Sequence, residues 1–176
     1  KAKDEDKLSF YGFDMQNPEK SMELILEFCE KNNILQDKNL QKEFSFIKDE
    51  NFKISQIRDK EKLLLEIKTY VETLSSPEAK ILSRALTNVM DSVKYYELDF
   101  NDYAKVNNVR DKLMAENVKW ISDFEKSKGN DLLLISGHNG HIAKSEKFYE
   151  PMGSHLKKIF EEKKLVPPID LCYDER

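Results

Sequence analysis

Glycine is nearly absent from the middle of this chain. The 176 residues contain five glycines and five prolines, and no glycine lies between Phe13 and Lys128. Because glycine supplies tight turns and weakens helices, so long an interval without it argues against a turn-rich all-β fold and favours helices. We therefore expect a helical excursion from about residue 18 to residue 128.

Cysteine, basic charge and long apolar runs are also scarce. Cys29 and Cys172 cannot build a disulfide framework and show no metal-ligand spacing, so we expect a reducing compartment, the cytoplasm. The 33 acidic residues outnumber the 29 basic ones, which excludes the broad basic surface of many nucleic-acid-binding proteins. No apolar run approaches the roughly 18 residues that cross a bilayer. We expect neither nucleic-acid nor membrane partners, and the oligomeric state stays open.

Two segments have the pattern of strands. Residues 8–13 alternate and are rich in aromatics, and residues 131–136 form a short apolar run that ends at a glycine. The predicted fold is therefore α/β and helix-rich, with a small, mainly parallel sheet surrounded by helices. Two strands are too few for a sheet core. We expect residues 1–176 to be a single domain that forms the C-terminal portion of a larger catalytic domain.

Apolar residues at helical spacing predict the helices. One begins at Pro18, a second covers 54–74, a third begins at Pro77, a fourth runs from about Asn101 to Lys126, and a fifth opens at Pro151. The second and third are expected to form an antiparallel hairpin over 54–97. The tail at 167–173 is expected to be extended. The predicted inward residues are Met22, Ile25, Leu26 and Cys29; Ile57, Leu64, Ile67, Val71 and Leu74; Leu82, Leu86, Val89, Val93 and Tyr96; Val106, Val109, Leu113, Val118, Ile121 and Phe124; and Leu156, Ile159 and Phe160.

Two of the three histidines lie in the turn that follows the second predicted strand. His138 and His141 flank Asn139 and Gly140, at the end of a strand where open α/β sheets bind ligands. One imidazole is suited to act as a general base and the other as an electrophile. The alternatives are a metal site and histidines that only bond the backbone. Because no further ligand cluster completes a zinc set, we predict no metal and no cofactor.

Three residues of the fourth predicted helix share one face. Arg110, Met114 and Asn117 occur at i, i+4 and i+7. There a guanidinium can stabilise an anionic intermediate and a carboxamide can orient a neighbouring group. The alternative is that Arg110 pairs with a surface acid and Asn117 faces water.

Asp14 and Gln16 follow the first predicted strand. Polar side chains at this edge would share a crevice with the histidine turn. Alternatively, Asp14 caps the helix that follows. The third histidine, His155, is expected to be exposed.

Four blocks of the sequence resemble the erythromycin esterase family in order and separation. They are Tyr11–Gln16, Arg110–Trp120, Gly137–Ile142, and Met152 and Gly153 with Leu156. The resemblance implies a hydrolase in which water, activated by a histidine base without a required metal, opens an ester or macrolide lactone, with a role in antibiotic resistance. It implies catalytic roles for His138, His141 and Arg110. It also implies substrate contacts from Asn139, Asn117, Asp14, Gln16 and Met114.

The general base of the family lies in a Gly-Glu-x-x-His-Gly type segment, and the chain contains no such motif. We expect the base to lie outside this chain, so that the fragment alone is inactive on its small-molecule ester. Two other functions remain open. One is a non-enzymatic helical binding module that uses the 54–97 hairpin, and the other is a divalent-metal-binding domain that uses His138 and His141.

Overall fold

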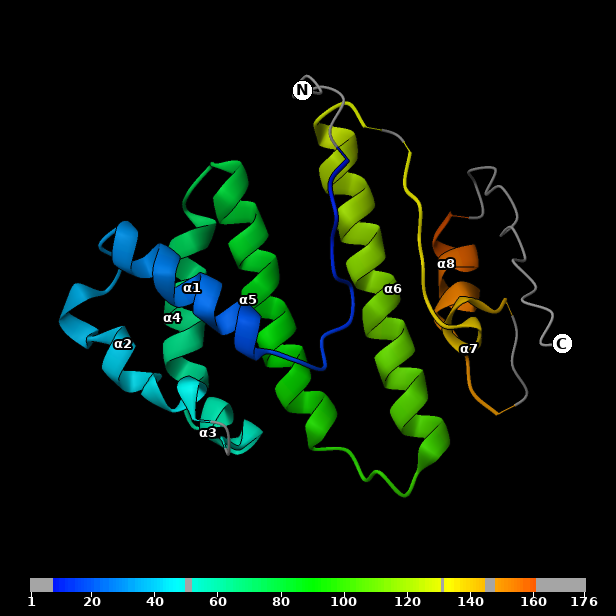
Figure 1. Ribbon diagram of the computed structural model, residues 1–176, viewed down its shortest axis with the longest axis horizontal. Coiled ribbons are helices and arrows are strands. Elements are labelled where there is room, and N and C mark those ends of the chain that lie inside the picture. Colours follow the sequence, from blue (N-terminus) through cyan, green and yellow to red (C-terminus); the bar gives the residue numbers. More distant parts are fainter. Residues whose placement is uncertain (1–7, 50–51, 131, 145–147, 161–176) are drawn as a thin grey trace, which may run out of the picture.

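Helices make up the regular structure of the described chain. A computed structural model describes residues 8–49, 52–130, 132–144 and 148–160. Helices α1 to α5 form one lobe, and the long helix α6 carries α7 and α8 on its other side (Figure 1). The elements are α1 Glu19–Lys31, η2 Gln36–Lys38, α2 Leu40–Glu43, η3 Ser45–Lys48, α3 Ile54–Arg58, α4 Glu61–Glu72, α5 Pro77–Tyr96, α6 Tyr103–Ser127, α7 Asn139–Ile142 and α8 Met152–Phe160.

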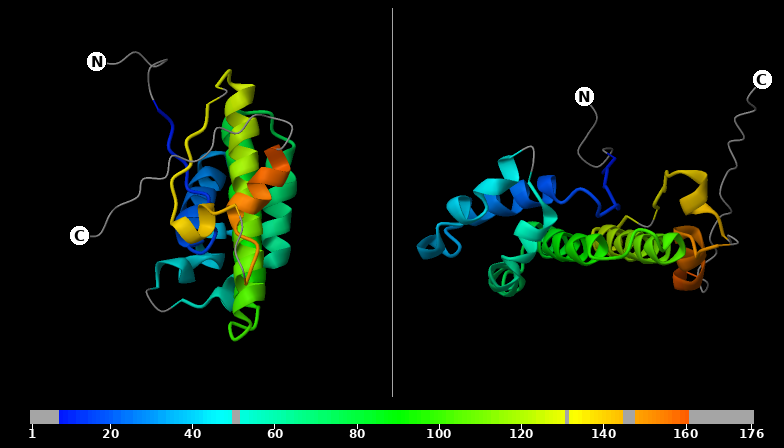
Figure 2. Two further views of the ribbon diagram at one scale, coloured as in Figure 1. Left: turned by 90° about the vertical axis from the view of Figure 1, so that its right-hand side faces the viewer. Right: turned by 90° about the horizontal axis from the view of Figure 1, so that it is seen from below.

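The predicted α/β fold is wrong, because the described residues contain no strand. Segments 8–13 and 132–136 are extended and lie on the same side of α6 (Figure 2). Within the described chain, no backbone hydrogen bond joins either segment to a partner strand. Their alternating side chains instead pack on helices: Phe13, Leu133 and Ile135 contact the core of α6 and α8. The alternate residues Leu132 and Leu134 are more than nine-tenths exposed.

The helical predictions are largely confirmed. All four residues expected on the inner face of α1 are buried, as are three in α5 and four in α6. The helix predicted at 54–74 is in fact two helices, α3 and α4. Ile57 of α3 and Leu64 of α4 lie seven residues apart and both are buried. The apolar spacing of a single helix therefore continues across the break between α3 and α4, so the sequence pattern does not show the break. Helices α4 and α5 pack together as the predicted antiparallel hairpin.

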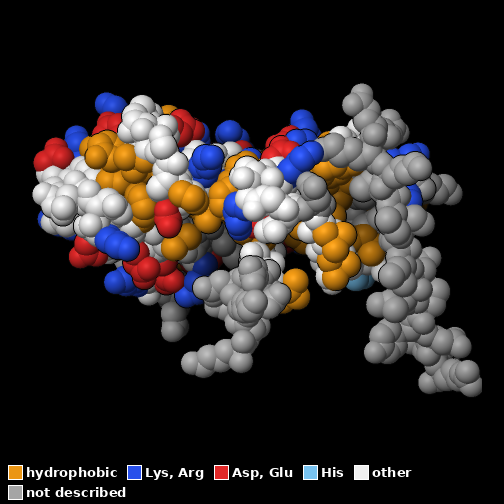
Figure 3. Space-filling view, turned by 90° about the horizontal axis from the view of Figure 1, so that it is seen from above, with side chains coloured by type: hydrophobic (Ala, Val, Ile, Leu, Met, Phe, Trp, Pro, Cys, Tyr) orange, Lys and Arg blue, Asp and Glu red, His pale blue; other side chains and the backbone are white. Residues whose placement is uncertain are grey.

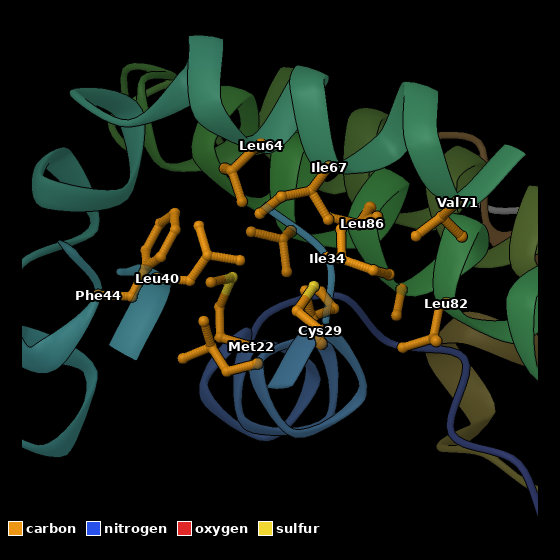
Figure 4. Close-up of a cluster of buried hydrophobic side chains, with 14 of the residues drawn as sticks. Met22, Cys29, Ile34, Leu40, Phe44, Leu64, Ile67, Val71, Leu82 and Leu86 are labelled. Carbon is orange, nitrogen blue, oxygen red and sulfur yellow. The ribbon is translucent and has the colours of Figure 1, made fainter. Parts of the chain in front are cut away.

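Side chains of the first lobe enclose one large apolar core. Met22 and Cys29 of α1 face Leu64 and Ile67 of α4 and Leu86 of α5 (Figure 4). Full burial of one such leucine or isoleucine stabilises the fold by roughly 1.5–3 kcal/mol. This core fixes α5, against which α6 then lies.

A separate, smaller core joins α6 to α8. It consists of Met114, Ala115 and Val118 of α6 and Met152, Leu156 and Phe160 of α8. The inward orientation predicted for Ile159 is wrong, since 37 % of this residue is exposed. Tyr96 is likewise exposed, and its neighbour Tyr95 is the buried residue, packed with Met15 and Val106.

Gly153 allows α8 to approach α7 closely. A Cβ atom at this position would lie 2.2 Å from the Ile142 carbonyl oxygen and 2.4 Å from that of Ala143. Only glycine fits this contact, which holds the segment with the histidines against α8. No helix of the described residues is long and apolar enough to cross a membrane. The extended tail predicted at 167–173 lies outside the described residues.

Candidate functional site

The histidine turn is a single helical turn, α7, capped by its own first histidine. The Gly140 N–H donates to His138 Nδ1 at 3.1 Å, and the Tyr149 hydroxyl donates to the Gly140 carbonyl oxygen at 3.1 Å. Because Nδ1 of His138 accepts a hydrogen bond, the neutral ring carries its proton on Nε2. His138 is exposed. His138 can therefore present the Nε2–H as a hydrogen-bond donor at the protein surface.

An aspartate of α6 fixes the opposite tautomer in His141. Its Nδ1 lies 2.7 Å from Asp111 Oδ1, and the His141 side chain is 20 % exposed. The carboxylate accepts, so Nδ1 donates and the lone pair of the neutral ring lies on Nε2. The two imidazole rings are 6.4 Å apart. One ring thus offers a donor and its neighbour a proton acceptor.

Asp111 is completely buried, and both of its oxygens are bonded. The second oxygen accepts the Met152 N–H at 2.8 Å, so one carboxylate joins α6, α7 and α8. Burial raises the pKa of the Asp111 carboxyl above its ordinary value, although the Met152 N–H and His141 act in the opposite direction. A buried charge needs such partners. Asp111 therefore depends first on the Met152 N–H and then on His141 to stabilise its ionised form.

No role for Asp111 was predicted from the sequence. A signal was present: Asp111 precedes Met114, Ala115 and Val118 at the spacing of the buried stripe of α6. A carboxylate in an apolar stripe must find a buried partner, and such positions are candidates for functional residues.

Arg110 lies beside this pair and binds Asp14. Its Nη2 forms an ion pair with Asp14, and the Arg110 side chain is 22 % exposed. The Arg110 Nε is buried without a hydrogen-bond partner in the described structure. Asp14 also accepts the Gln16 N–H at 3.2 Å, whereas no side chain caps α1. Asp14 therefore anchors the arginine and does not cap the helix.

Gln16 and Asn117 fix the extended segment that carries Asp14. The Gln16 amide donates to the Tyr95 hydroxyl at 3.1 Å, and Asn117 Nδ2 donates to the Phe13 carbonyl oxygen at 2.8 Å. Asn117 Oδ1 accepts from Arg84 Nε at 2.6 Å. Asn117 is thus buried between α5 and the segment, with both ends of its amide bonded within the protein.

The other predicted site residues lie around this centre at different depths. Met114 is 1 % exposed and packs in the core, whereas Asn139 is exposed on α7. His155 is more buried than expected, with a side-chain exposure of 18 % and Nδ1 3.9 Å from Glu150. Within the described ranges, no three His, Cys, Asp or Glu residues group as ligands for a metal ion.

A buried carboxylate thus orients one imidazole beside a second imidazole, and Arg110 precedes that carboxylate on α6. Residues of these types can perform acid–base chemistry. A family model described as erythromycin esterase matches residues 1–166, and the chain belongs to this family. The chain is thus an esterase-like hydrolase at the level of the family, and the resemblance seen in four sequence blocks is confirmed. Neither the comparison with curated proteins nor that with solved structures gave a match.

Proposed function

We propose that this site hydrolyses a carboxylic ester of a small molecule by adding water to the carbonyl carbon, with no metal or cofactor. The proposal rests above all on the opposite tautomers of the two imidazoles. His141 receives its orientation from Asp111 at 2.7 Å, and His138 receives its own from Gly140 at 3.1 Å. The pair therefore combines one proton acceptor with one hydrogen-bond donor.

Each group has a role in the proposed reaction. The Nε2–H of His138 donates to the ester carbonyl oxygen, and Arg110 stabilises the oxyanion that forms when water adds. The water proton passes to a general base, which we assign to a histidine of a Gly-Glu-x-x-His-Gly type segment outside these residues. Nε2 of His141, which Asp111 orients, accepts this proton from the base and returns it to the leaving alkoxide, so that both groups end the cycle as they began it. The products are one carboxylic acid and one alcohol.

Of the remaining predicted residues, two position the site and one contacts the substrate. Asp14 and Gln16 position Arg110 and the segment beside it, and exposed Asn139 is placed to contact the bound ester. Within the ester class we propose a macrolide lactone and a role in antibiotic resistance, which the family name supports. Because the base is supplied from elsewhere, residues 1–176 alone are expected to be inactive.

Replacement of the histidines in the full-length protein tests the proposal. We expect His138→Ala and His141→Ala each to lower kcat/KM for a macrolide lactone or an aryl ester by roughly 10²-fold or more. His155→Ala is the matched control, since His155 contacts Glu150 and not the site. Activity within about a factor of two of the parent in both site variants would show that the histidines are not catalytic.

A further inference from the structure

A hollow with a volume of about 410 Å³ opens where α4 ends, α5 begins and α6 ends. Figure 3 shows this end of the molecule, with hydrophobic side chains at the surface among charged ones. None of the lining residues belongs to the histidine site. The volume falls within the usual range for pockets that bind small molecules. The lining residues that the argument uses are Glu72, Leu74, Lys80, Trp120, Asp123 and Phe124.

Aromatic side chains line one wall of the hollow. Trp120 and Phe124 occupy successive turns of α6, and their rings stack with centroids 5.0 Å apart and planes 9° apart. Leu74 adds an aliphatic side chain from the end of α4. Phe124 is only 7 % exposed and Lys128 Nζ lies over its ring, whereas Trp120 is half-buried. Trp120 therefore offers the ring surface on which a planar apolar molecule can lie.

The charges around the hollow leave one lysine without a partner. Glu72 is bound by Lys68 and by the Ser83 hydroxyl, and Asp123 is bound by Lys119. Lys80 is exposed and has no ion-pair partner within the described structure. It lies in the first turn of α5, where the helix dipole adds partial positive charge. Among the residues that line the hollow, the charge without a partner is therefore positive.

We propose that this hollow is a second binding site, for a small planar aromatic molecule that carries one anionic group. The ring of the ligand lies against Trp120, and its carboxylate or equivalent group pairs with Lys80. The proposal is independent of ester hydrolysis, since it shares no residue with the histidine site.

Trp120 is the only tryptophan of the chain, so its fluorescence reports on this site alone. The probes are 3-phenylpropionate, the neutral 3-phenylpropionamide and the cationic 3-phenylpropylamine, with excitation at a wavelength that none absorbs. We expect saturable changes in emission, with the anion binding about two- to fivefold more tightly than the amide, as for an exposed ion pair. High salt should reduce this preference.

Two lysine variants distinguish the contribution of the Lys80 charge to binding from that of the apolar hollow. Lys80→Met should remove the preference for the anion and leave amide binding unchanged. Lys105→Met is the matched control, because Lys105 is exposed at the other end of α6. Non-saturating quenching, equal affinity for anion and amide, or an unchanged preference in Lys80→Met would each overturn the proposal. Emission that changes only with protein concentration would place a second copy of the chain in the hollow and would also overturn it.

Discussion

The carboxylate of Asp111 and the imidazole of His141 form a hydrogen bond of 2.7 Å between the middle of α6 and the single turn of α7. The aspartate is inaccessible to solvent, whereas the histidine reaches the surface. This difference in exposure allows one residue to orient and the other to react. It also means that the role of His141 can be tested through a residue that no substrate touches.

Asp111→Asn removes the charge and preserves the shape of the side chain. We expect kcat to fall by about 10- to 100-fold, because the amide no longer fixes the proton of His141 on Nδ1 or stabilises the charged ring. Steady-state kinetics on an aryl ester, together with a melting curve to show that the variant is folded, provides the measurement. Asp102→Asn is the control, since asparagine caps α6 as well as aspartate does. Equal losses in both variants would contradict the assigned role.

Glu125 makes stability depend on acidic pH. Its pKa is lowered to about 2, first by Lys128 and then by the Tyr11 hydroxyl, both of which bond its carboxylate. The unfolded chain takes up a proton near pH 4.5, so the stabilisation is complete above that pH. It is lost as the pH falls from 4.5 to about 2, because the unfolded state then binds more protons.

Glu125→Gln should therefore flatten the curve of unfolding free energy against pH between 4.5 and 2. Urea titrations at a series of pH values measure this curve. Glu27→Gln, at an exposed position on α1, should leave its slope unchanged. A parent protein with no change in stability across this interval would contradict the ion-pair assignment.

Gly153→Ala is expected to be strongly destabilising. The added methyl group would overlap the carbonyl oxygens of Ile142 and Ala143, which are backbone atoms and cannot move aside without displacing α7. We expect a loss of about 2 kcal/mol or more, measured by thermal or denaturant unfolding. At Gly12 an added Cβ meets nothing within 4 Å. Gly12→Ala should therefore unfold at nearly the temperature of the parent.

Asn117 connects α5 to the segment that carries Asp14. Asn117→Ala leaves Arg84 Nε and the Phe13 carbonyl oxygen without their partner, at a cost of about 1–3 kcal/mol. A double-mutant cycle with Arg84→Ala should give a coupling energy of about 0.5–3 kcal/mol. Additive effects of the two substitutions would show that the bond contributes nothing. A rise in KM without any loss of stability would instead favour direct contact between Asn117 and the substrate.

Apolar periodicity was sufficient to predict most of the helices. Met22, Ile25, Leu26 and Cys29 of α1 are buried as their spacing indicates, because the inward face of a helix is encoded locally. Residues 8–13 and 132–136 were predicted as strands on equally local grounds. Their extended conformation follows from the sequence, but strand pairing depends on a distant partner. Here α6 and α8 provide the apolar contact instead.

The candidate site was predicted in part. The sequence pattern placed Asp14 and Arg110 on different elements of one site, and the structure joins the two residues in an ion pair. It did not distinguish the two histidines, because their tautomers depend on Gly140 and Asp111, contacts that only the folded chain defines. It also placed Met114 in the site on the basis of its helix face, although that face is partly core.

The two larger apolar cores of the molecule do not merge, and a third, small cluster of Met15, Tyr95 and Val106 lies between α5 and α6. One lies among α1 to α5, and the other lies between α6 and α8 beneath the histidines. Regions with separate cores can open separately, at free energies below that of global unfolding. Local opening of α7 and α8 would expose the buried oxygens of Asp111 while the first lobe stays folded. We therefore expect α7 and α8, which carry His141 and the partner N–H of Asp111, to open and close without unfolding the helices that hold α6 in place.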